Sequence, residues 1–490
     1  MRAASSLAPA PGESAEPDED YRELAAFFDA FAEDEQRWRK RNRTYHRLLE
    51  RVTAFQIPPG ASVLEIGSGS GDLLAALGSE DALGVDVSPR MTELARRRHP
   101  ELDFMCAAGE RFEAGRTFDY IILSDLTPLV HDLQALFTNI ARHSHRRTRV
   151  IVNSYNTLWR PALALSERLR LKPRKPVRNW ISPDDIRNLF ELTGFETLAS
   201  ARRILLPKRV PLLTGFLNGF LANIWPFTTL CLTWWIVARP RPGDRLDESV
   251  SVICPCRNEQ GHIAEILRRL PTFGSETELV FVEGNSTDDT RREIERQLEL
   301  NPEINAKLII QPGKGKGDAV RAGFAAATND VLMILDGDLS VRPEDLPKFY
   351  RALVDGHGEL VNGSRLVYDI EPGAMRLLNV VGNKIFSRLF GAITGYRVKD
   401  TLCGTKVLRR EDYELVARGR SYFGEFDPFG DFDLLFGAAR LNLKIIDIPV
   451  RYQPRAYGET NISRFRHGLL LLRMTVFAFR KFRLSIFHSR

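Results

Sequence analysis

The chain has 490 residues, of which 43% are hydrophobic and 27% charged, and its formal net charge is +6. This length is too great for one ordinary core and favours two or three domains of a globular protein. The small net charge calls for no nucleic-acid partner. The five scattered cysteines form no zinc-ligand pattern, and we expect buried thiols in a reducing compartment.

The first domain is expected to follow a disordered tail. Residues 1–20 are rich in Ala, Pro, Ser and Glu and have no apolar segment typical of a signal peptide. Residues 21–54 have helical periodicity, which Ile57-Pro-Pro-Gly60 ends. Strands and helix-length segments then alternate, which predicts a parallel sheet covered on both faces. The predicted strands are 62–66, 82–86, 102–106, 118–124 and 148–153, with another helix and strand over 182–206.

A glycine-rich turn follows the first predicted strand. Gly67, Gly69 and Gly71 come directly after Glu65, and Asp86 ends the second strand. Glycines let the backbone turn sharply and approach a ligand, and the helix start after them presents free N–H groups. A carboxylate at the end of the second strand suits the hydroxyls of a ribose. This combination resembles the class I S-adenosylmethionine-dependent methyltransferases, over residues 21–240.

The resemblance implies a Rossmann-like sheet and a site for S-adenosylmethionine. By position, Glu65 and the three glycines would line the methionine and ribose side of the cofactor, and Asp86 would bind the ribose. Where this family usually has an acid near the adenine, the chain has Ala108, and Glu110 is expected to take its place.

The segment after the fourth predicted strand is where an acceptor commonly meets the cofactor in this family. Asp125 lies there and is the candidate base for a hydroxyl acceptor, with a loop residue that is satisfied within the protein as the alternative. His131 follows it, and for this residue we favour the simpler interpretation of a surface loop position. The sequence leaves the methyl acceptor open.

The stretch from Val210 to Ala238 contains no charged side chain and is long enough to span a membrane. Pro, Gly and Asn residues interrupt the segment, and Trp234 to Ala238 are typical of a strand. We therefore favour an apolar helix, resting on a membrane surface or capping a lipid-sized pocket, followed by the last strand of the first domain. Residues 241–248 are a linker by composition.

A second α/β domain is predicted over residues 249–464. It has no internal repeat in common with the first domain. Its predicted elements are strand 249–254, helix 260–270, strand 278–283, helix 287–298, strand 307–310, helix 316–327 and strand 331–335.

Asp336 and Asp338 follow the last of these strands. Two carboxylates at the end of a buried strand suit Mg²⁺ or Mn²⁺ bridging a diphosphate. Three further segments make the pattern specific, because they end the first two strands and open the helix before the Asp pair. They are Cys254-Pro-Cys-Arg-Asn-Glu259, Glu283-Gly-Asn-Ser-Thr-Asp288 and Lys314-Gly-Lys316. This ordered set resembles the family 2 glycosyltransferases of GT-A fold, of the dolichol- or polyprenyl-phosphate sugar synthase type.

The resemblance implies a nucleotide-sugar donor and a lipid-phosphate or glycolipid acceptor. The residues expected beside the nucleotide-sugar are Pro255, Arg257, Glu259, Glu283, Lys316 and Asp336. Asp336 and Asp338 would hold the metal, with Asp338 in a catalytic role, and the phosphates or acceptor would face Arg365, Lys406 and Arg455. For a hydroxyl acceptor Asp431 is a candidate catalytic base, and a helix N-cap is the alternative role for this residue.

The C-terminal segment is strongly basic, with six Arg, one Lys and no acidic residue in 464–490. Arg466, Arg473 and Arg480 are seven residues apart and share one face of a predicted helix. This pattern predicts an interfacial helix over 465–490 on an anionic membrane surface. The competing interpretation is a core or dimer helix whose cations are solvated.

Together these features predict a bifunctional methyl- and glycosyltransferase of cell-surface glycan or glycolipid synthesis. We expect a cytoplasmic protein associated peripherally with the inner face of the membrane. The alternative is a glycosyltransferase whose methyltransferase-like domain is a regulatory or scaffolding module. The sugar, the lipid and the oligomeric state are left open.

Overall fold

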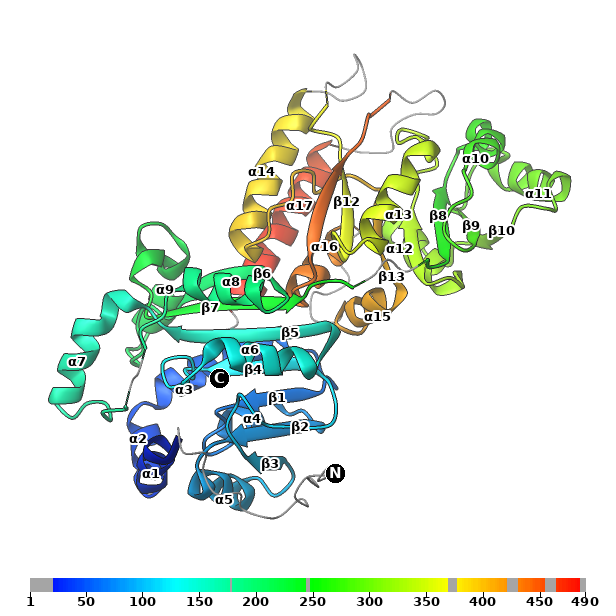
Figure 1. The fold of residues 1–490 in the computed structure, drawn as a ribbon. Coiled ribbons are helices and arrows are strands. Elements are labelled where there is room, and N and C mark those ends of the chain that lie inside the picture. The colour runs from blue at the N-terminus through cyan, green and yellow to red at the C-terminus, as the bar shows by residue number, and fades with distance from the viewer. Residues whose placement is uncertain are drawn as a thin grey trace, which may run out of the picture. The chain divides into compact units, whose positions relative to one another are not determined.

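The structure is a computed structural model that describes residues 21–176, 179–243, 247–368, 377–420, 431–453 and 464–484. The chain divides into two compact units, Met1–Arg241 and Pro242–Arg490. Each unit has an α/β fold built on one seven-stranded sheet (Figure 1).

Three helices precede the sheet of the first unit: α1 (Arg22–Phe31), α2 (Glu35–Arg41) and α3 (Arg43–Gln56). The segment predicted as one helical region is thus divided by a turn after Phe31 and by Asn42, whose backbone leaves the helical region. Helix α3 buries Leu48, Leu49 and Val52, because these positions recur on one face of the helix.

The first sheet is mixed. Its strands are β1 (Val63–Ile66), β2 (Ala82–Asp86), β3 (Asp103–Cys106), β4 (Phe118–Ser124), β5 (Ser144–Tyr155), β6 (Phe195–Arg203) and β7 (Thr233–Pro240). Their order is β3-β2-β1-β4-β5-β7-β6, with β7 antiparallel to both of its neighbours. The five strands for which a parallel arrangement was predicted, β1 to β5, are indeed parallel. The predicted last strand, β7, runs antiparallel to them, because it follows β6 in the chain and pairs with it directly. The helices after the first strand are α4 (Asp72–Leu77), α5 (Pro89–Arg98), α6 (Leu133–Arg142), α7 (Arg160–Arg168), α8 (Pro183–Leu192) and α9 (Leu213–Gly219).

Strand order reverses between β1 and β4. The chain leaves β1 toward β2 and β3 and then returns to the other side of β1. In open α/β sheets ligands bind outside the carboxyl ends of strands at such a reversal. Strand β1 and residues Tyr120 to Leu123 of β4 are buried, which matches the apolar side chains that dominate both stretches.

The connection from β6 to β7 contains α9 and two short 3₁₀ turns, Leu221–Asn223 and Phe227–Leu230. The long apolar helix predicted here is thus only seven residues, Leu213–Gly219. Buried Asn218 anchors the connection, because its side chain accepts from the backbone N–H groups of Leu205 and Leu206 at 2.7 and 2.8 Å.

The second sheet has the strands β8 (Val250–Cys256), β9 (Thr277–Glu283), β10 (Ala306–Ile310), β11 (Val331–Ile334), β12 (Leu360–Ser364), β13 (Lys406–Arg409) and β14 (Ile445–Pro449). Their order is β10-β9-β8-β11-β13-β12-β14, and β13 is antiparallel to β11 and β12. The helices are α10 (Ile263–Arg269), α11 (Thr290–Leu300), α12 (Lys316–Ala326), α13 (Leu346–Val354), α14 (Leu377–Thr394), α15 (Arg410–Arg418), α16 (Asp431–Arg440) and α17 (Arg464–Phe479). Strand order reverses between β8 and β11, so the carboxyl ends of these two strands define the expected ligand crevice.

Helix α17 packs against α14 in the second unit. It buries Leu471, Met474 and Ala478, whereas Arg473 is exposed, as is Arg480 in the π-helical turn Arg480–Leu484 that follows α17. One face of the helix therefore belongs to the core, and the face with the predicted basic stripe is turned outward. The side chain of Arg466 lies outside the described residues.

Among the described helices, none combines the length and the apolar character that crossing a bilayer requires.

Candidate active sites

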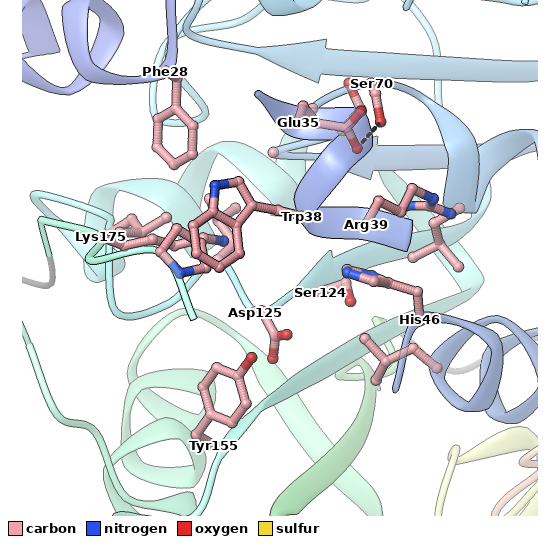
Figure 2. Close-up of a pocket in the computed structure, with 18 of the residues that line it drawn as sticks. Phe28, Glu35, Trp38, Arg39, His46, Ser70, Ser124, Asp125, Tyr155 and Lys175 are labelled. Carbon is pink, nitrogen blue, oxygen red and sulfur yellow. Dashed lines mark hydrogen bonds between the residues drawn. The ribbon is translucent and has the colours of Figure 1, made fainter. Parts of the chain in front are cut away.

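A cavity of about 480 Å³ lies in the first unit at the carboxyl ends of β1 and β4 (Figure 2). Its wall includes Glu65, Gly67, Gly69, Asp86 and Asp125. The strand reversal thus brings together residues predicted from three separate strand ends. Gly71 is not part of the wall; it is the left-handed N-cap of α4.

The glycine turn adopts a conformation that other residues rarely accept. The φ angles of Gly67, Gly69 and Gly71 are 76°, 53° and 76°. A Cβ atom on Gly67 would come within 2.7 Å of the Leu126 side chain. The turn therefore needs glycine both for its backbone and for the space that its neighbours leave.

Glu65 is buried at the cavity wall, with 3% of its surface exposed. Its Oε2 atom has no hydrogen-bond partner in the structure. Burial raises the pKa of this carboxyl group to about 8, although the positive charge of Arg39 opposes the shift. A buried polar atom without a partner at a cavity wall is expected where a bound ligand supplies the missing hydrogen bond.

Asp86 ends β2 and also lines the cavity. Its two carboxylate oxygens accept from the backbone N–H groups of Gly69 at 2.8 Å and Ser88 at 2.9 Å. Burial raises the pKa of the Asp86 carboxyl, and these two N–H groups partly counter that effect. Each oxygen has a second lone pair, so the carboxylate can still accept from ligand hydroxyls.

Glu110 lies on the same cavity wall. Its carboxylate accepts from the Tyr21 hydroxyl and, at 3.2 Å, from the backbone N–H of Asp132. His131 is exposed, and its backbone N–H donates to the Tyr21 oxygen at 2.9 Å. The structure thus places Glu110 in the wall and leaves the His131 side chain on the surface.

Asp125 follows β4 with a φ of 52°. Its carboxylate accepts from the Tyr45 hydroxyl at 2.7 Å and from the Asn153 amide at 3.2 Å. The rings of Tyr45 and Tyr155 stack with centroids 5.8 Å apart. Burial raises the pKa values of Asp125 and of both phenols. The Asp125 carboxylate of this group can receive a proton from a substrate inside the cavity, while the two phenols remain protonated.

Several residues of this wall were not predicted from the sequence. Tyr155 was identifiable, because it ends β5, the strand next to β4. Lys172 lies outside regular elements, and its ammonium group is 4.5 Å from the Tyr155 ring centroid. Lys175 lies in the same segment, with its ammonium group 5.8 Å from the Phe28 ring centroid (Figure 2). Burial lowers the pKa of Lys172, and no sequence pattern pointed to this lysine.

His46 also contributes to this wall. Burial, helped by the positive charge of Arg39, lowers the pKa of its imidazole to about 3. The ring is therefore neutral at physiological pH.

In the second unit Asp336 and Asp338 follow β11, at the strand reversal beside β8. Asp336 Oδ1 lies 2.5 Å from Lys316 Nζ, at the start of α12. Burial alone would raise the pKa of Asp336, but the positive charges of Lys316, Arg365 and Lys406 outweigh it and hold that pKa below its usual value. The carboxylate is thus kept ionised within a cationic surrounding.

Asp338 is 7% exposed and accepts from the backbone N–H of Ser340 at 3.0 Å. Within the described residues, no group of three or more His, Cys, Asp or Glu side chains could hold a metal ion. Carboxylate oxygens suit Mg²⁺ and Mn²⁺, and Mg²⁺ commonly binds one or two carboxylates while phosphates and waters complete its shell. Asp336 and Asp338 therefore fit a Mg²⁺-like ion that is held by two carboxylates while phosphates and waters supply its other ligands.

The loop before β13 approaches the Asp336–Lys316 pair closely. A Cβ atom on Gly404 would collide with both the Asp336 carboxylate and the Lys316 ammonium. Two positions further, Lys406 is completely buried and donates to the carbonyl oxygen of Cys403. Lys406 therefore influences Asp336 through its positive charge, although its side chain is not exposed at the site.

The ends of β8 and β9 are adjacent, because Cys256 pairs with Glu283 in the sheet. Glu283 accepts from the Ser286 backbone N–H at 2.6 Å, and the Glu259 carboxylate lies within hydrogen-bond distance, 2.9 Å, of His262 Nδ1. Arg257 is exposed and Pro255 partly buried at the same edge. The predicted nucleotide-sugar residues thus converge on one edge of the sheet.

Arg365 is occupied by an acidic partner. Its Nε and a terminal nitrogen donate to the two oxygens of fully buried Asp400 at 2.7 and 2.9 Å. Burial disfavours the charged guanidinium, but Asp400 outweighs it and raises the pKa of Arg365. Arg455 lies outside the described residues, as does the side chain of Asp431, whose backbone opens α16.

Comparison with known proteins matches each unit to a family. Residues 251–416 match the family model "Glycosyl transferase family 2" and residues 37–200 match "Methyltransferase domain". The chain is 31% identical over 223 residues to glycosyltransferase AglJ of Haloferax volcanii, covering 45% of this chain and 69% of that protein. It is also 31% identical over 226 residues to a dolichyl-phosphate hexose transferase of the same organism, covering 45% and 90%.

The chain belongs to glycosyl transferase family 2. It is an enzyme of that family that also carries a methyltransferase domain, so we refer below to the glycosyltransferase unit and the methyltransferase unit. The resemblances drawn from both sets of motifs are thereby confirmed. Among the relatives, the covered share of their length runs from 51% to 94%.

Solved structures resemble the separate units. An S-adenosylmethionine-dependent methyltransferase of Thermotoga maritima aligns with a TM-score of 0.35 at 19% identity, covering 44% of this chain and 99% of that one.

Proposed function

We propose that the chain catalyses two transfers at the cytoplasmic face of a membrane, in the synthesis of cell-surface glycans or glycolipids. The glycosyltransferase unit moves a sugar from a nucleotide-sugar to a polyprenyl phosphate or another lipid-linked acceptor. The methyltransferase unit moves a methyl group from S-adenosylmethionine to an acceptor beside Asp125. The name of the dolichyl-phosphate hexose transferase relative supports the lipid acceptor.

The observation that carries the sugar transfer is the Lys316–Asp336 contact of 2.5 Å beside Asp338, at the strand reversal. Asp336 and Asp338 would hold Mg²⁺ or Mn²⁺, which supplies positive charge to a leaving nucleoside diphosphate. The Lys316 ammonium lies close enough to interact with the negative charge of the leaving diphosphate. The proposed nucleoside site is bordered by Pro255, Arg257, Glu259 and Glu283. Preorganised positive charge of this kind stabilises a developing anion without reorganisation.

A lipid phosphate needs no base, because it is already an anion when it attacks the anomeric carbon. A hydroxyl acceptor needs one, and Asp431 remains the proposed base for that case. Lys406, Arg365 and Arg455 are proposed to set the positive potential that attracts the phosphates. For Arg365 and Lys406 this proposal is electrostatic, since their polar groups have partners within the protein.

For the methyl transfer, the observation is the unpartnered Oε2 of Glu65 in the wall of the cavity. S-adenosylmethionine carries a cationic amino group and ribose hydroxyls, which fit Glu65 and Asp86, while Glu110 is proposed near the adenine. It supplies an activated methyl group. Asp125 would receive the proton of a hydroxyl acceptor, with Tyr45 and Tyr155 holding its carboxylate in place.

The outward face of α17 supports a membrane contact of the glycosyltransferase unit, as it combines exposed Leu472 and Val476 with Arg473 and Arg480. We retain 465–490 as the proposed interfacial segment and 241–248 as the linker. Deletion of the segment after residue 464 should reduce flotation with anionic vesicles.

Mass spectrometry of lipid-linked sugars from cells with and without the gene tests both transfers. Loss of a lipid-linked sugar and loss of a methyl group on the same or a related product are expected. If the sugar disappears but no methylated product changes, and the purified chain binds no S-adenosylmethionine, the alternative of a regulatory methyltransferase-like module is correct.

A further inference from the structure

Exposed large apolar residues concentrate on two segments of the methyltransferase unit. Of the 22 such residues in the described part of the chain, four lie in 158–171 and nine in 210–230. Trp225 is 81% exposed and Leu212 95%. The others on these segments are Leu158, Leu165, Leu169, Leu171, Val210, Leu213, Phe216, Phe220, Ile224, Phe227 and Leu230. Such a concentration exceeds what scattered surface residues explain.

The two segments form one continuous surface. The Asn156 amide donates to the carbonyl oxygens of Thr229 and Cys231, each at 3.0 Å. The Trp159 indole N–H donates to the Leu230 carbonyl oxygen at 2.9 Å. These bonds join the start of the first segment to the end of the second, and Figure 1 shows α7 and α9 at the same end of the unit. We call the surface formed by 157–176 and 207–230 the apolar–basic face.

The charge of this face is almost entirely positive. Residues 157–176 contain six Arg or Lys and one acidic residue, Glu167, while residues 207–230 contain two cations and no acid. Glu167 lies 3.7 Å from Lys172, so its charge is locally compensated. Arg160, Arg170 and Arg174 are exposed beside the apolar side chains. Exposed Trp, Phe and Leu interleaved with cations match the chemistry of an anionic lipid–water interface.

The face also borders the cavity. Trp159, Leu163 and Leu171 of the first segment belong to the cavity wall, as do Pro207 and Lys208 at the start of the second. A ligand entering between these residues would pass directly from the apolar–basic face to Asp125 and Tyr155, which line the same cavity.

We propose that the apolar–basic face docks the methyltransferase unit on an anionic lipid bilayer, and that the methyl acceptor is a lipid-borne molecule drawn from that bilayer. The docking stands on the exposed residues and their charge alone. The nature of the acceptor rests in addition on the proposed methyl transfer, and it adds a substrate class to it. A lipid-borne acceptor explains why the cavity wall combines apolar residues of the face with the polar group at Asp125.

The charge pattern favours a bilayer over a protein partner. Another copy of the chain would bring the same cations to the same face and would be repelled. An anionic bilayer accommodates both the cations and the apolar side chains, since its headgroups attract the cations and the apolar side chains leave water.

The test uses the full chain and vesicles of phosphatidylglycerol with phosphatidylcholine, or of phosphatidylcholine alone. Hydrogen–deuterium exchange is measured with and without vesicles, because it locates the contact even if α17 also binds. The expected result is slower exchange in 157–171 and 210–230 with anionic vesicles, and reversal of this protection at high salt. Protection confined to 464–484 would overturn the proposal. So would full protection of the face without vesicles, since a protein surface would then cover it.

A triple variant, Leu212→Ser, Phe216→Ser and Trp225→Ser, removes apolar area from the face without touching the cavity wall. Its vesicle affinity should fall by at least about tenfold, because three large apolar side chains would no longer be transferred from water into the lipid surface. Leu192→Ser is the matched control, as Leu192 is 62% exposed on α8 of the same unit, and its affinity should not change. Equal losses in both proteins, or none in the triple variant, would overturn the docking.

S-adenosylmethionine binding is measured by calorimetry on the same preparations. Retained binding in the triple variant shows a folded unit and separates docking from the cofactor site. No binding by the unaltered chain would remove the proposed methyl transfer, and with it the acceptor, while the docking result would stand on its own. Transfer of the methyl group to a lipid extract presented in vesicles should also be slower with the triple variant. If the unaltered chain methylates only molecules of a water-soluble extract, the proposal of a lipid-borne acceptor is wrong.

Discussion

Lys316 Nζ lies 2.5 Å from Asp336 Oδ1, where the loop after β11 meets the start of α12. The pair joins two motifs that are 20 residues apart in the chain. Gly404, from a third segment, leaves the space that both side chains need. The positive charge around this carboxylate is thus part of the fold before any donor binds.

Lys316→Met should move the acid limb of sugar transfer to higher pH. Lys316 is one of the cations that hold the pKa of Asp336 below its usual value. A depressed pKa keeps the carboxylate charged until the pH falls through it, so removal of the cation brings protonation on at higher pH. The measurement is the pH profile of kcat/KM, with Lys314→Met as the neighbouring control. An unchanged acid limb would mean that Asp336 protonation does not limit the reaction.

Asp338→Ala should reduce turnover by at least about two orders of magnitude, because the diphosphate charge loses part of its metal clamp. The wild-type enzyme should lose activity with EDTA and regain it with Mg²⁺ or Mn²⁺. Circular dichroism checks the fold, since Asp338 also accepts from the Ser340 N–H. Near-normal transfer in the variant or in EDTA would contradict the metal role.

Glu65→Gln should stabilise the cofactor-free methyltransferase unit, and more so at pH 8 than at pH 5. Burial raises the pKa of Glu65 from its ordinary value of 4.5 to about 8, so between these pH values the folded state keeps a proton that the unfolded state releases. Stability therefore falls as pH rises through that window, by at most about 1.4 kcal/mol per pH unit. Thermal unfolding of both proteins across this range measures the difference, and parallel curves would contradict it.

S-adenosylmethionine binding should release a proton near pH 7 if its amino group pairs with Glu65, because a nearby cation favours the ionised carboxyl. Calorimetry in buffers of different ionisation enthalpy counts that proton. Glu65→Gln should abolish the release and weaken the affinity.

Asp125→Asn should lower methyl transfer by about 10²–10⁴-fold if Asp125 is a general base, with cofactor affinity nearly unchanged. Tyr45→Phe removes a 2.7 Å hydrogen bond to the same carboxylate and should cause a smaller loss. Single-turnover rates with labelled S-adenosylmethionine are the readout. Equal rates in Asp125→Asn and the wild-type enzyme would exclude the base.

Asp400→Ala should destabilise the glycosyltransferase unit by about 3–5 kcal/mol, because Arg365 would keep a buried charge without its partner. The pair is bidentate and Asp400 is fully buried. The midpoint of the urea transition measures the loss, and an unchanged midpoint would contradict the structural role.

The strands from β1 to β11 were predictable, because short apolar runs mark most of them and several of their ends carry motifs. Strands β12, β13 and β14 were not predicted. Three further features escaped the sequence. The direction of β7 depends on pairing with distant β5. The apolar segment after Val210 had the composition of a helix, but its Pro and Gly residues limit α9 to Leu213–Gly219. Lys172 lies in a segment without periodicity, so its contact with Tyr155 depends on how that segment folds and could not be predicted from the sequence.

The antiparallel direction of β7 has a consequence for how this enzyme can diversify. Tyr155 and Arg203 both pair with Thr233, so β7 begins at the edge where β5 and β6 end. The stretch between β6 and β7 therefore leaves and re-enters the sheet at one edge, where sheet hydrogen bonds fix its two ends, and Leu205, Pro207, Lys208 and Leu232 near those ends line the cavity. Its length and side chains can vary between relatives without disturbing β1 and β2, where the glycine turn lies. Substrate choice and cofactor use can then evolve separately within one domain.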